Sequence, residues 1–192
     1  LAPALGNALE VAVCMEVLAG NKAAAPRLHD LTVALGARVL ALHGEDEGAA
    51  ERKLRDAISS GRAMARFSQM IAMMGGPPDM ADDWRTHLPK ARVVGDVAAP
   101  QAGYVSAIDG EALGLAVVDL GGGRRVETDR INPAVGLSDV VPLGAKVAKN
   151  QPLCTIHAAN EGDAEAAAQA VLKAIVIGEK PPLKPLVIER IS

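Results

Sequence analysis

The scarcity of aromatic residues is the sequence feature that most constrains how this chain can fold. Phe67, Trp84 and Tyr104 are the only aromatic residues among 192, although 49% of the chain is apolar. The core must therefore consist of Ala, Val, Leu, Ile and Met, which favours closely packed helices and a sheet rich in β-branched residues. The same scarcity argues against a base-stacking platform for nucleic acids, which needs exposed rings.

Charge and cysteine content narrow the functional classes further. A net charge of −3 argues against a nucleic-acid partner or an anionic membrane surface. Cys14 and Cys154 lie far apart without a CxxC motif, which predicts a reducing, cytoplasmic location. No apolar run reaches membrane-spanning length and no signal-peptide pattern opens the chain. The opening residues, without an initiator Met, predict that the chain is part of a longer protein.

Residues 1–75 carry helical periodicity. Asn7 followed by Glu10 resembles a capping box, with the Asn side chain accepting a first-turn N–H. We expect helices at about 7–19, 27–42, 49–60 and 62–74, ended by glycines. The second is expected to place four aliphatic residues on one face: Leu28, Leu31, Leu35 and Val39. Residues 79–91 are polar and predict an irregular connector.

From Arg92 onward the pattern changes to short strands between glycine and proline turns. Asp109 is expected to cap a helix over about 111–120, and a second helix is expected over 163–177. Strands are expected at about 93–97, 103–108, 140–141, 145–147, 153–157 and 186–191. Helices first and a mixed region afterwards predict an α+β arrangement, or part of a larger α/β domain. We therefore divide the chain into 1–91 and 92–192.

The stretch Gly121-Gly122-Gly123-Arg124-Arg125 allows two interpretations. Three glycines can present backbone N–H groups to a phosphate, and two arginines add positive charge. However, a phosphate cradle normally precedes a helix, whereas these glycines follow one. The pattern therefore favours helix termination and a tight turn over anion binding.

The residues that usually carry catalysis form no constellation in this sequence. The four histidines are scattered and lack a second ligand at metal-binding spacing. Neither cysteine has a basic neighbour in sequence that would activate it as a nucleophile. Nothing singles out a pair of carboxylates. We therefore predict no catalytic and no substrate-binding residue in this chain.

Several ordered stretches resemble the thymidine and pyrimidine-nucleoside phosphorylases. Residues 6–11 are similar to that family's GNALEV helix start, and residues 26–36 are similar to its next helix. The most specific match is 112–124, ALGLAVVDLGGGR. Residues 134–139, Gly144, and the turn at 151–153 followed by 156–158 continue the resemblance, which covers essentially the whole chain.

The resemblance implies a dimeric transferase that splits thymidine with phosphate into thymine and 2-deoxyribose 1-phosphate, in pyrimidine salvage or catabolism. In this family a small helical domain joins a large α/β domain, and the Lys-His-Ser-Thr-Gly-Gly phosphate signature lies upstream of GNALEV. That signature and the residues that grip the pyrimidine do not occur here. The resemblance thus implies that 1–91 supplies rear helices of the large domain and 92–192 a C-terminal αβ subdomain of barrel-sandwich (hammerhead-like) type. The isolated chain is expected to be inactive and to associate with the N-terminal part or with itself.

The resemblance also implies a remnant of a potassium site. Some relatives bind K⁺ through backbone carbonyls at positions matching Leu1 and Ala4, together with a Glu just after GNALEV. The position matching that Glu is Val13 in this chain. Leu1 and Ala4 are therefore the metal-binding candidates, and no other cofactor is expected.

Two alternatives stay open at this point. The same fold could serve another nucleoside or a nucleotide, such as uridine or AMP, because the discriminating residues lie upstream. Residues 140–156 also resemble half of a biotinyl or lipoyl carrier barrel, which would be a non-catalytic module. A carrier needs a modifiable lysine at a hairpin tip, and residues 107–111 contain none.

Overall fold

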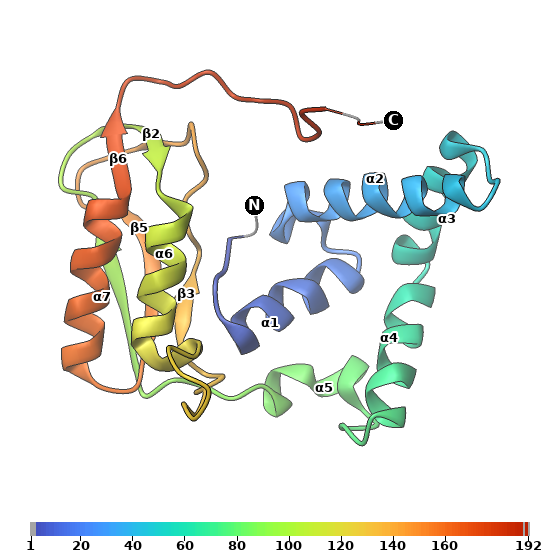
Figure 1. The fold of residues 1–192 in the computed structure, drawn as a ribbon, viewed down its shortest axis with the longest axis horizontal. Coiled ribbons are helices and arrows are strands. Elements are labelled where there is room, and N and C mark those ends of the chain that lie inside the picture. The colour runs from blue at the N-terminus through green and yellow to red at the C-terminus, as the bar shows by residue number, and fades with distance from the viewer. Residues whose placement is uncertain (1–2, 190, 192) are drawn as a thin grey trace. The chain divides into compact units, whose positions relative to one another are not determined.

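The fold was analysed in a computed structural model that describes residues 3–189 and 191 (Figure 1). The described residues form two compact units. Unit 1 contains residues 12–88, 185–189 and 191, and unit 2 contains residues 3–11 and 89–184. No helix among the described residues is both long and apolar enough to cross a membrane.

Unit 1 is helical. Its elements are the greater part of α1 (Asn7–Leu18), then η1 (Lys22–Ala24), α2 (Pro26–Leu42), α3 (Glu47–Ser59), α4 (Arg62–Met73) and α5 (Met80–His87). Local sequence sets several of these ends. The Asp46 side chain accepts the Ala49 N–H at 2.8 Å and so caps α3. Gly61, at φ +78°, separates α3 from α4 in a left-handed conformation that favours glycine.

The start of α1 corrects the predicted capping box. Asn7 is the first helical residue, and its side-chain Nδ2 donates to the Gly122 carbonyl at 2.9 Å. The Glu10 carboxylate accepts the Gly6 N–H at 2.9 Å, while the Gly6 carbonyl accepts the Glu10 N–H at 3.0 Å. The Glu10 side chain therefore accepts a backbone N–H at the helix start, as in a capping box. That N–H belongs to Gly6, and Asn7 is not the capping residue.

The predicted connector at 79–91 is wrong, because it contains α5. Met80 and Trp84, four positions apart, are both buried, and a kink at Asp83 (φ −130°, ψ 35°) lies between them. The acidic residues around them concealed these two apolar positions in the sequence.

The four residues predicted to share one face of α2 are not its buried stripe. The buried residues are His29, Val33 and Ala37, which recur every four positions. Leu35 and Val39 are more than half exposed, and Leu42 is 78% exposed. The helix therefore packs mainly through His29, Val33 and Ala37, while Leu28 and Leu31 are only half-buried.

Unit 2 contains two three-stranded antiparallel sheets. The first has the order β1 (Val93–Ala98), β5 (Pro152–Ala158), β3 (Gly136–Ser138). The second has the order β4 (Lys146–Val147), β2 (Gly103–Ile108), β6 (Ile175–Gly178). The predicted strand at 140–141 is wrong. The strand begins four residues earlier, at Gly136, because Gly136–Ser138 pair with Thr155, Ile156 and His157 of β5. No strand occurs over the described part of 186–191, and Arg190 lies outside the described residues.

Three helical segments complete unit 2. They are α6 (Gly110–Val117), the π-helical turn η2 (Val118–Gly122) and α7 (Glu161–Ala174). Asp109 caps α6 by accepting the Ala112 N–H at 3.0 Å, as predicted. Helix α7 ends three residues earlier than predicted because Ile175, Val176 and Ile177 pair with β2. The β-branched run therefore adopts the strand that its side chains favour.

The core of unit 2 lies between its helices and sheets. Helix α7 packs on α6 and on β1 and β5, side by side with α6 in Figure 1. Apart from Cys154, the largest fully buried side chains of this core are aliphatic, as the shortage of aromatic residues requires: Val105, Val135, Leu137, Leu153 and Val171. The mixed α+β class expected from the sequence is thus confirmed.

The N-terminal segment of unit 2 extends the first sheet by backbone contacts. Leu5 and Leu137 exchange two N–H···O bonds of 2.9 and 2.8 Å, and the Val140 N–H donates to the Pro3 carbonyl at 2.9 Å. The chains approach closely because both sides have glycine. A Cβ at Gly6 would lie 2.6 Å from the Val135 oxygen, and one at Gly136 would overlap the Leu5 oxygen.

Candidate functional site

The glycine-arginine turn is engaged by the protein's own acidic groups. Gly121, at φ +92°, breaks the helical path within η2, and the Arg125 side chain forms an ion pair with Asp119. The Asp129 carboxylate accepts the N–H of Arg125 at 2.9 Å and that of Val126 at 3.1 Å. These two N–H bonds hold the pKa of Asp129 below its usual value. An internal carboxylate thus occupies the two backbone N–H groups of Arg125 and Val126 that follow the glycines, and Arg125 is paired with Asp119, which favours the turn interpretation.

A polar cluster on three strands was missed by sequence reasoning. In the first sheet Thr155 of β5 lies opposite both Asp96 of β1 and Ser138 of β3. The Thr155 hydroxyl donates to Asp96 at 2.7 Å, and Ser138 Oγ lies 2.9 Å from His157 Nε2. Thr155 and Asp96 are 59 positions apart in sequence, so only the strand register could have predicted their contact.

The hydrogen bonds in this cluster argue against a serine nucleophile activated by histidine. The Ser138 hydroxyl donates to the Asp139 carboxylate at 2.9 Å, which leaves His157 Nε2 as the donor to Ser138 Oγ. Burial lowers the pKa of His157, and the negative charge of Asp139 opposes that shift. A histidine that donates to the serine cannot take its proton, so this arrangement is a structural bridge between β3 and β5.

The two cysteines lie in different environments. Burial raises the pKa of Cys154 to about 12, helped by the charges of Asp96 and Asp139, so its thiol stays protonated. Cys14 is exposed, and the two form no disulfide. The buried, protonated state of Cys154 argues against a role for this thiol as a nucleophile.

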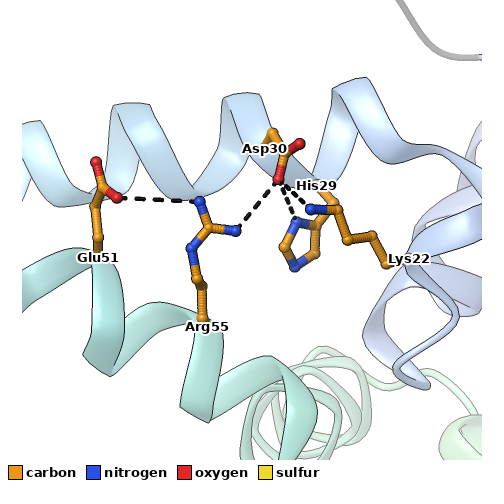
Figure 2. A network of polar contacts seen from close by, with 5 residues as sticks. All are labelled: Lys22, His29, Asp30, Glu51 and Arg55. Atoms are coloured by element: carbon orange, nitrogen blue, oxygen red, sulfur yellow. Dashed lines mark hydrogen bonds and ion pairs between the residues drawn. The ribbon is translucent and has the colours of Figure 1, made fainter.

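Figure 2 shows the densest polar network of unit 1, centred on one oxygen of Asp30. Asp30 Oδ1 lies 2.7 Å from Lys22 Nζ, 3.0 Å from His29 Nδ1 and 3.2 Å from Arg55 Nη1. The hydrogen bonds from Lys22 and His29 hold the pKa of Asp30 well below its usual range, and Arg55 adds to this effect. Because its members come from η1, α2 and α3, this Asp30 network joins three elements of unit 1.

The other histidines have local contacts of the same structural kind. His43 Nδ1 lies 2.9 Å from the Val39 carbonyl at the end of α2, and His87 Nε2 lies 2.8 Å from Asp79 beside α5. Within residues 3–189 and 191, no group of three or more His, Cys, Asp or Glu side chains is placed to hold a metal ion.

The potassium-site candidates are only partly within the described residues. Leu1 lies outside them. Ala4 is buried in the segment that pairs with β3, and the carbonyls on either side of it, at Pro3 and Leu5, already accept N–H groups. Val13 offers no carboxylate. A hard cation needs several oxygens, so Ala4 alone does not complete a potassium site, and the Leu1 and Ala4 assignment stays a prediction.

Comparison with known proteins identifies relatives along the whole chain. Residues 104–178, from β2 to the end of β6, match the pyrimidine nucleoside phosphorylase C-terminal domain. The full chain is 43% identical to a thymidine phosphorylase of Burkholderia cenocepacia, of which it covers 44%. Its identity to the thymidine phosphorylase of Burkholderia orbicola is 44%, in an alignment that covers 95% of this chain and 42% of the relative. Its identity to the thymidine phosphorylase of Burkholderia lata is 42%, and the chain covers 44% of that relative. The chain therefore spans less than half the length of the curated relatives it matches.

Proposed function

Because the chain belongs to the thymidine and pyrimidine-nucleoside phosphorylase family, matching the C-terminal portion of its members, we propose that it is the C-terminal part of such an enzyme. The complete protein would transfer the deoxyribosyl group of thymidine to phosphate, releasing thymine and 2-deoxyribose 1-phosphate. The observation that carries this proposal is 43% identity to a thymidine phosphorylase over the whole chain. Phosphate, a pyrimidine nucleoside and the N-terminal part of the enzyme are the proposed partners.

The role we propose for these 192 residues is support of a site built elsewhere. The polar clusters described above are occupied by their own partners: Asp129 by backbone N–H groups, and Ser138 by Asp139 and His157. Chemistry at the glycosidic bond needs groups that bind phosphate and stabilise charge at the base. The sequence carries neither the phosphate signature nor the base-binding residues implied by the family.

The test is phosphate-dependent release of thymine from thymidine, measured with the 192-residue chain and with the parental protein. We expect turnover by the parental protein and none by the chain alone. Robust turnover by the chain alone would contradict the supporting role. A parental protein that splits uridine or AMP in preference to thymidine would keep the family and change the substrate.

The carrier alternative has less support. The segment that would hold a modifiable lysine leads directly into α6, where Asp109 caps the helix in place of a hairpin tip. Intact mass after expression tests this alternative, since attached biotin or lipoate would add a fixed mass to the chain.

Several further properties belong to the same proposal. They are a cytoplasmic location, a homodimeric parental enzyme, a place in pyrimidine salvage or catabolism, and a functional division at residues 91 and 92. Potassium binding through the carbonyls of Leu1 and Ala4 would require further oxygen ligands from the N-terminal part. A potassium-dependent rise in the melting temperature of the parental protein, absent with sodium, would support that site.

A further inference from the structure

One surface pocket of unit 2 combines basic side chains with an apolar lining. It has a volume of about 310 Å³ and is lined by Lys90, Ala91, Arg92, Asn132, Ala134 and Ala159. The first sheet explains this grouping. Arg92 precedes the first residue of β1, Ala159 follows the last residue of β5, and Val93 and Ala158 are paired. All six residues belong to unit 2.

The charges in this pocket are not neutralised by the protein. Within the described part of the chain, the side chains of Lys90 and Arg92 have no hydrogen bond or ion pair. The lining contains no carboxylate. This differs from the glycine-arginine turn, where Arg125 is paired with Asp119 and Asp129 takes the backbone N–H groups.

Asn132 adds an oriented neutral donor. Its Oδ1 accepts the Ala134 N–H at 3.1 Å, and its own N–H donates to the Gly121 carbonyl at 2.8 Å. Because the side-chain oxygen of Asn132 accepts the Ala134 N–H, the hydrogen bond fixes which end of the side-chain amide is oxygen. The other end, Nδ2, remains as a donor. Among residues 3–189 and 191 this nitrogen has no partner. Asn132 is half-buried, which makes an unused donor costlier than at an open surface.

We propose that this pocket binds the phosphate group of a small molecule through Lys90, Arg92 and Asn132. The side chains of Lys90, Arg92 and Asn132 offer donors that have no acceptor within the described part of the protein, and such donors suit an oxyanion. An arginine side chain can bind two oxygens of one phosphate at the same time. A volume near 310 Å³ is at the lower limit of ligand sites, which fits a compact molecule such as inorganic phosphate or a sugar phosphate. This inference does not depend on the proposed function, because the pocket lies wholly within this chain.

The test is a titration of the 192-residue chain followed by amide NMR shifts. Inorganic phosphate and ribose 5-phosphate are added at constant ionic strength, with sodium chloride as the reference salt. We expect saturable shifts confined to residues near 90–92, 132–134 and 159. Tighter binding of ribose 5-phosphate would identify a phosphorylated metabolite as the ligand, and equal binding would identify the phosphate group alone.

Asn132→Asp is the most informative variant. The new carboxylate can still accept the Ala134 N–H, but it replaces the Nδ2 donor with a negative charge. Loss of a hydrogen bond to a charged group predicts at least about a tenfold weaker affinity. Arg92→Gln is the second variant and is expected to weaken binding by a similar factor without altering any internal contact of the described chain.

Lys146→Gln is the matched control, because Lys146 is an exposed lysine of the same unit on β4, outside the pocket lining. It should leave phosphate affinity unchanged. Circular dichroism and thermal unfolding verify that each variant is folded. Equal weakening by Lys146→Gln, shifts that spread over all basic residues, or saturable binding of an acidic peptide without binding of phosphate would each overturn the proposal.

Discussion

The two units of this chain are stabilised in different ways. In unit 1 the ion pairs are numerous: the Asp30 network joins three elements, and Arg85 pairs with Glu16, Arg38 with Glu47 and Lys53 with Glu45. Helix α4 has no buried residue at all. In unit 2 a continuous aliphatic core links both sheets to α6 and α7. Unit 1 should therefore respond to pH and salt, and unit 2 to changes in core volume.

Truncation of the unit 2 core should have the largest effect. Leu137→Ala removes a fully buried side chain from β3 and is expected to lower the free energy of unfolding by about 2–5 kcal/mol. Leu42→Ala in unit 1 is the control, because that side chain is largely exposed and its loss should cost less than about 0.5 kcal/mol. Urea unfolding measures both. Equal losses would contradict the contrast between the units.

Gly136→Ala should have the next largest effect. Gly136 has φ +150°, and an added Cβ would overlap the Leu5 carbonyl, so the N-terminal segment must move away from β3. We expect a loss of about 2 kcal/mol or more, with faster hydrogen exchange at the amides of Leu5 and Leu137. Gly95→Ala on β1 is a control, since a Cβ there would meet nothing within 4 Å. Unchanged exchange at Leu5 would show that the close approach is not needed.

Asp30→Asn tests the ion pairs of unit 1. Exposed pairs contribute about 0.2–1 kcal/mol each, so a loss near 1 kcal/mol is expected at neutral pH. The pKa of Asp30 is lowered in the folded state, so its contribution is present above the ordinary Asp value of about 3.9 and is lost as pH falls through the folded value. The difference between wild type and variant should therefore shrink in strong acid and at high salt. Glu51→Gln, which loses only a 4.0 Å contact with Arg55, is the milder control.

His157→Gln should have the smallest effect, and it adds a pH dependence to unit 2. Burial lowers the pKa of His157, so the folded state resists its protonation. Wild-type stability should fall as pH decreases from the ordinary histidine value of 6.5 through the lower folded value. Glutamine can still donate to Ser138 and does not titrate, so the variant should lose this dependence. The urea midpoints of wild type and variant at pH 7.5 and pH 5 measure the pH dependence of stability. If the variant keeps the wild-type dependence, the dependence comes from another group.

Local patterns in the sequence predicted most helices but not the contacts between distant elements. The helices at 7–18, 26–42 and 47–59 follow from glycine stops, caps and periodicity that lie within a few residues of one another. Helix α5 was missed because its buried residues, Met80 and Trp84, are too few to make a periodic apolar pattern. Strand β6 was missed because pairing with β2 decides between helix and strand at Ile175. That choice depends on a partner about 70 residues away.

The candidate sites follow the same division. The turn at Gly121 could be predicted because its glycines and its preceding helix are adjacent in sequence. The link between Ser138 and His157, and the pocket formed by Arg92, Asn132 and Ala159, depend on the register of β1, β5 and β3. The spacing of residues along the sequence does not predict which residues of these strands pair with one another. The exposure of Leu35 and Val39 was also unpredictable, since periodicity indicates an apolar face without saying what covers it.

The pairing of Leu5 with Leu137 has a consequence for biosynthesis. Asn7 and Gly122 are 115 positions apart, yet the helix that starts at Asn7 is held by the Gly122 carbonyl, and Leu5 needs a strand that is made later still. At 5–20 residues per second, the emerging N-terminal segment must wait on the order of 10 s for its partner. During that interval its backbone groups are exposed to solvent and to other nascent chains. The order of synthesis therefore delays this backbone pairing until most of the unit has been made.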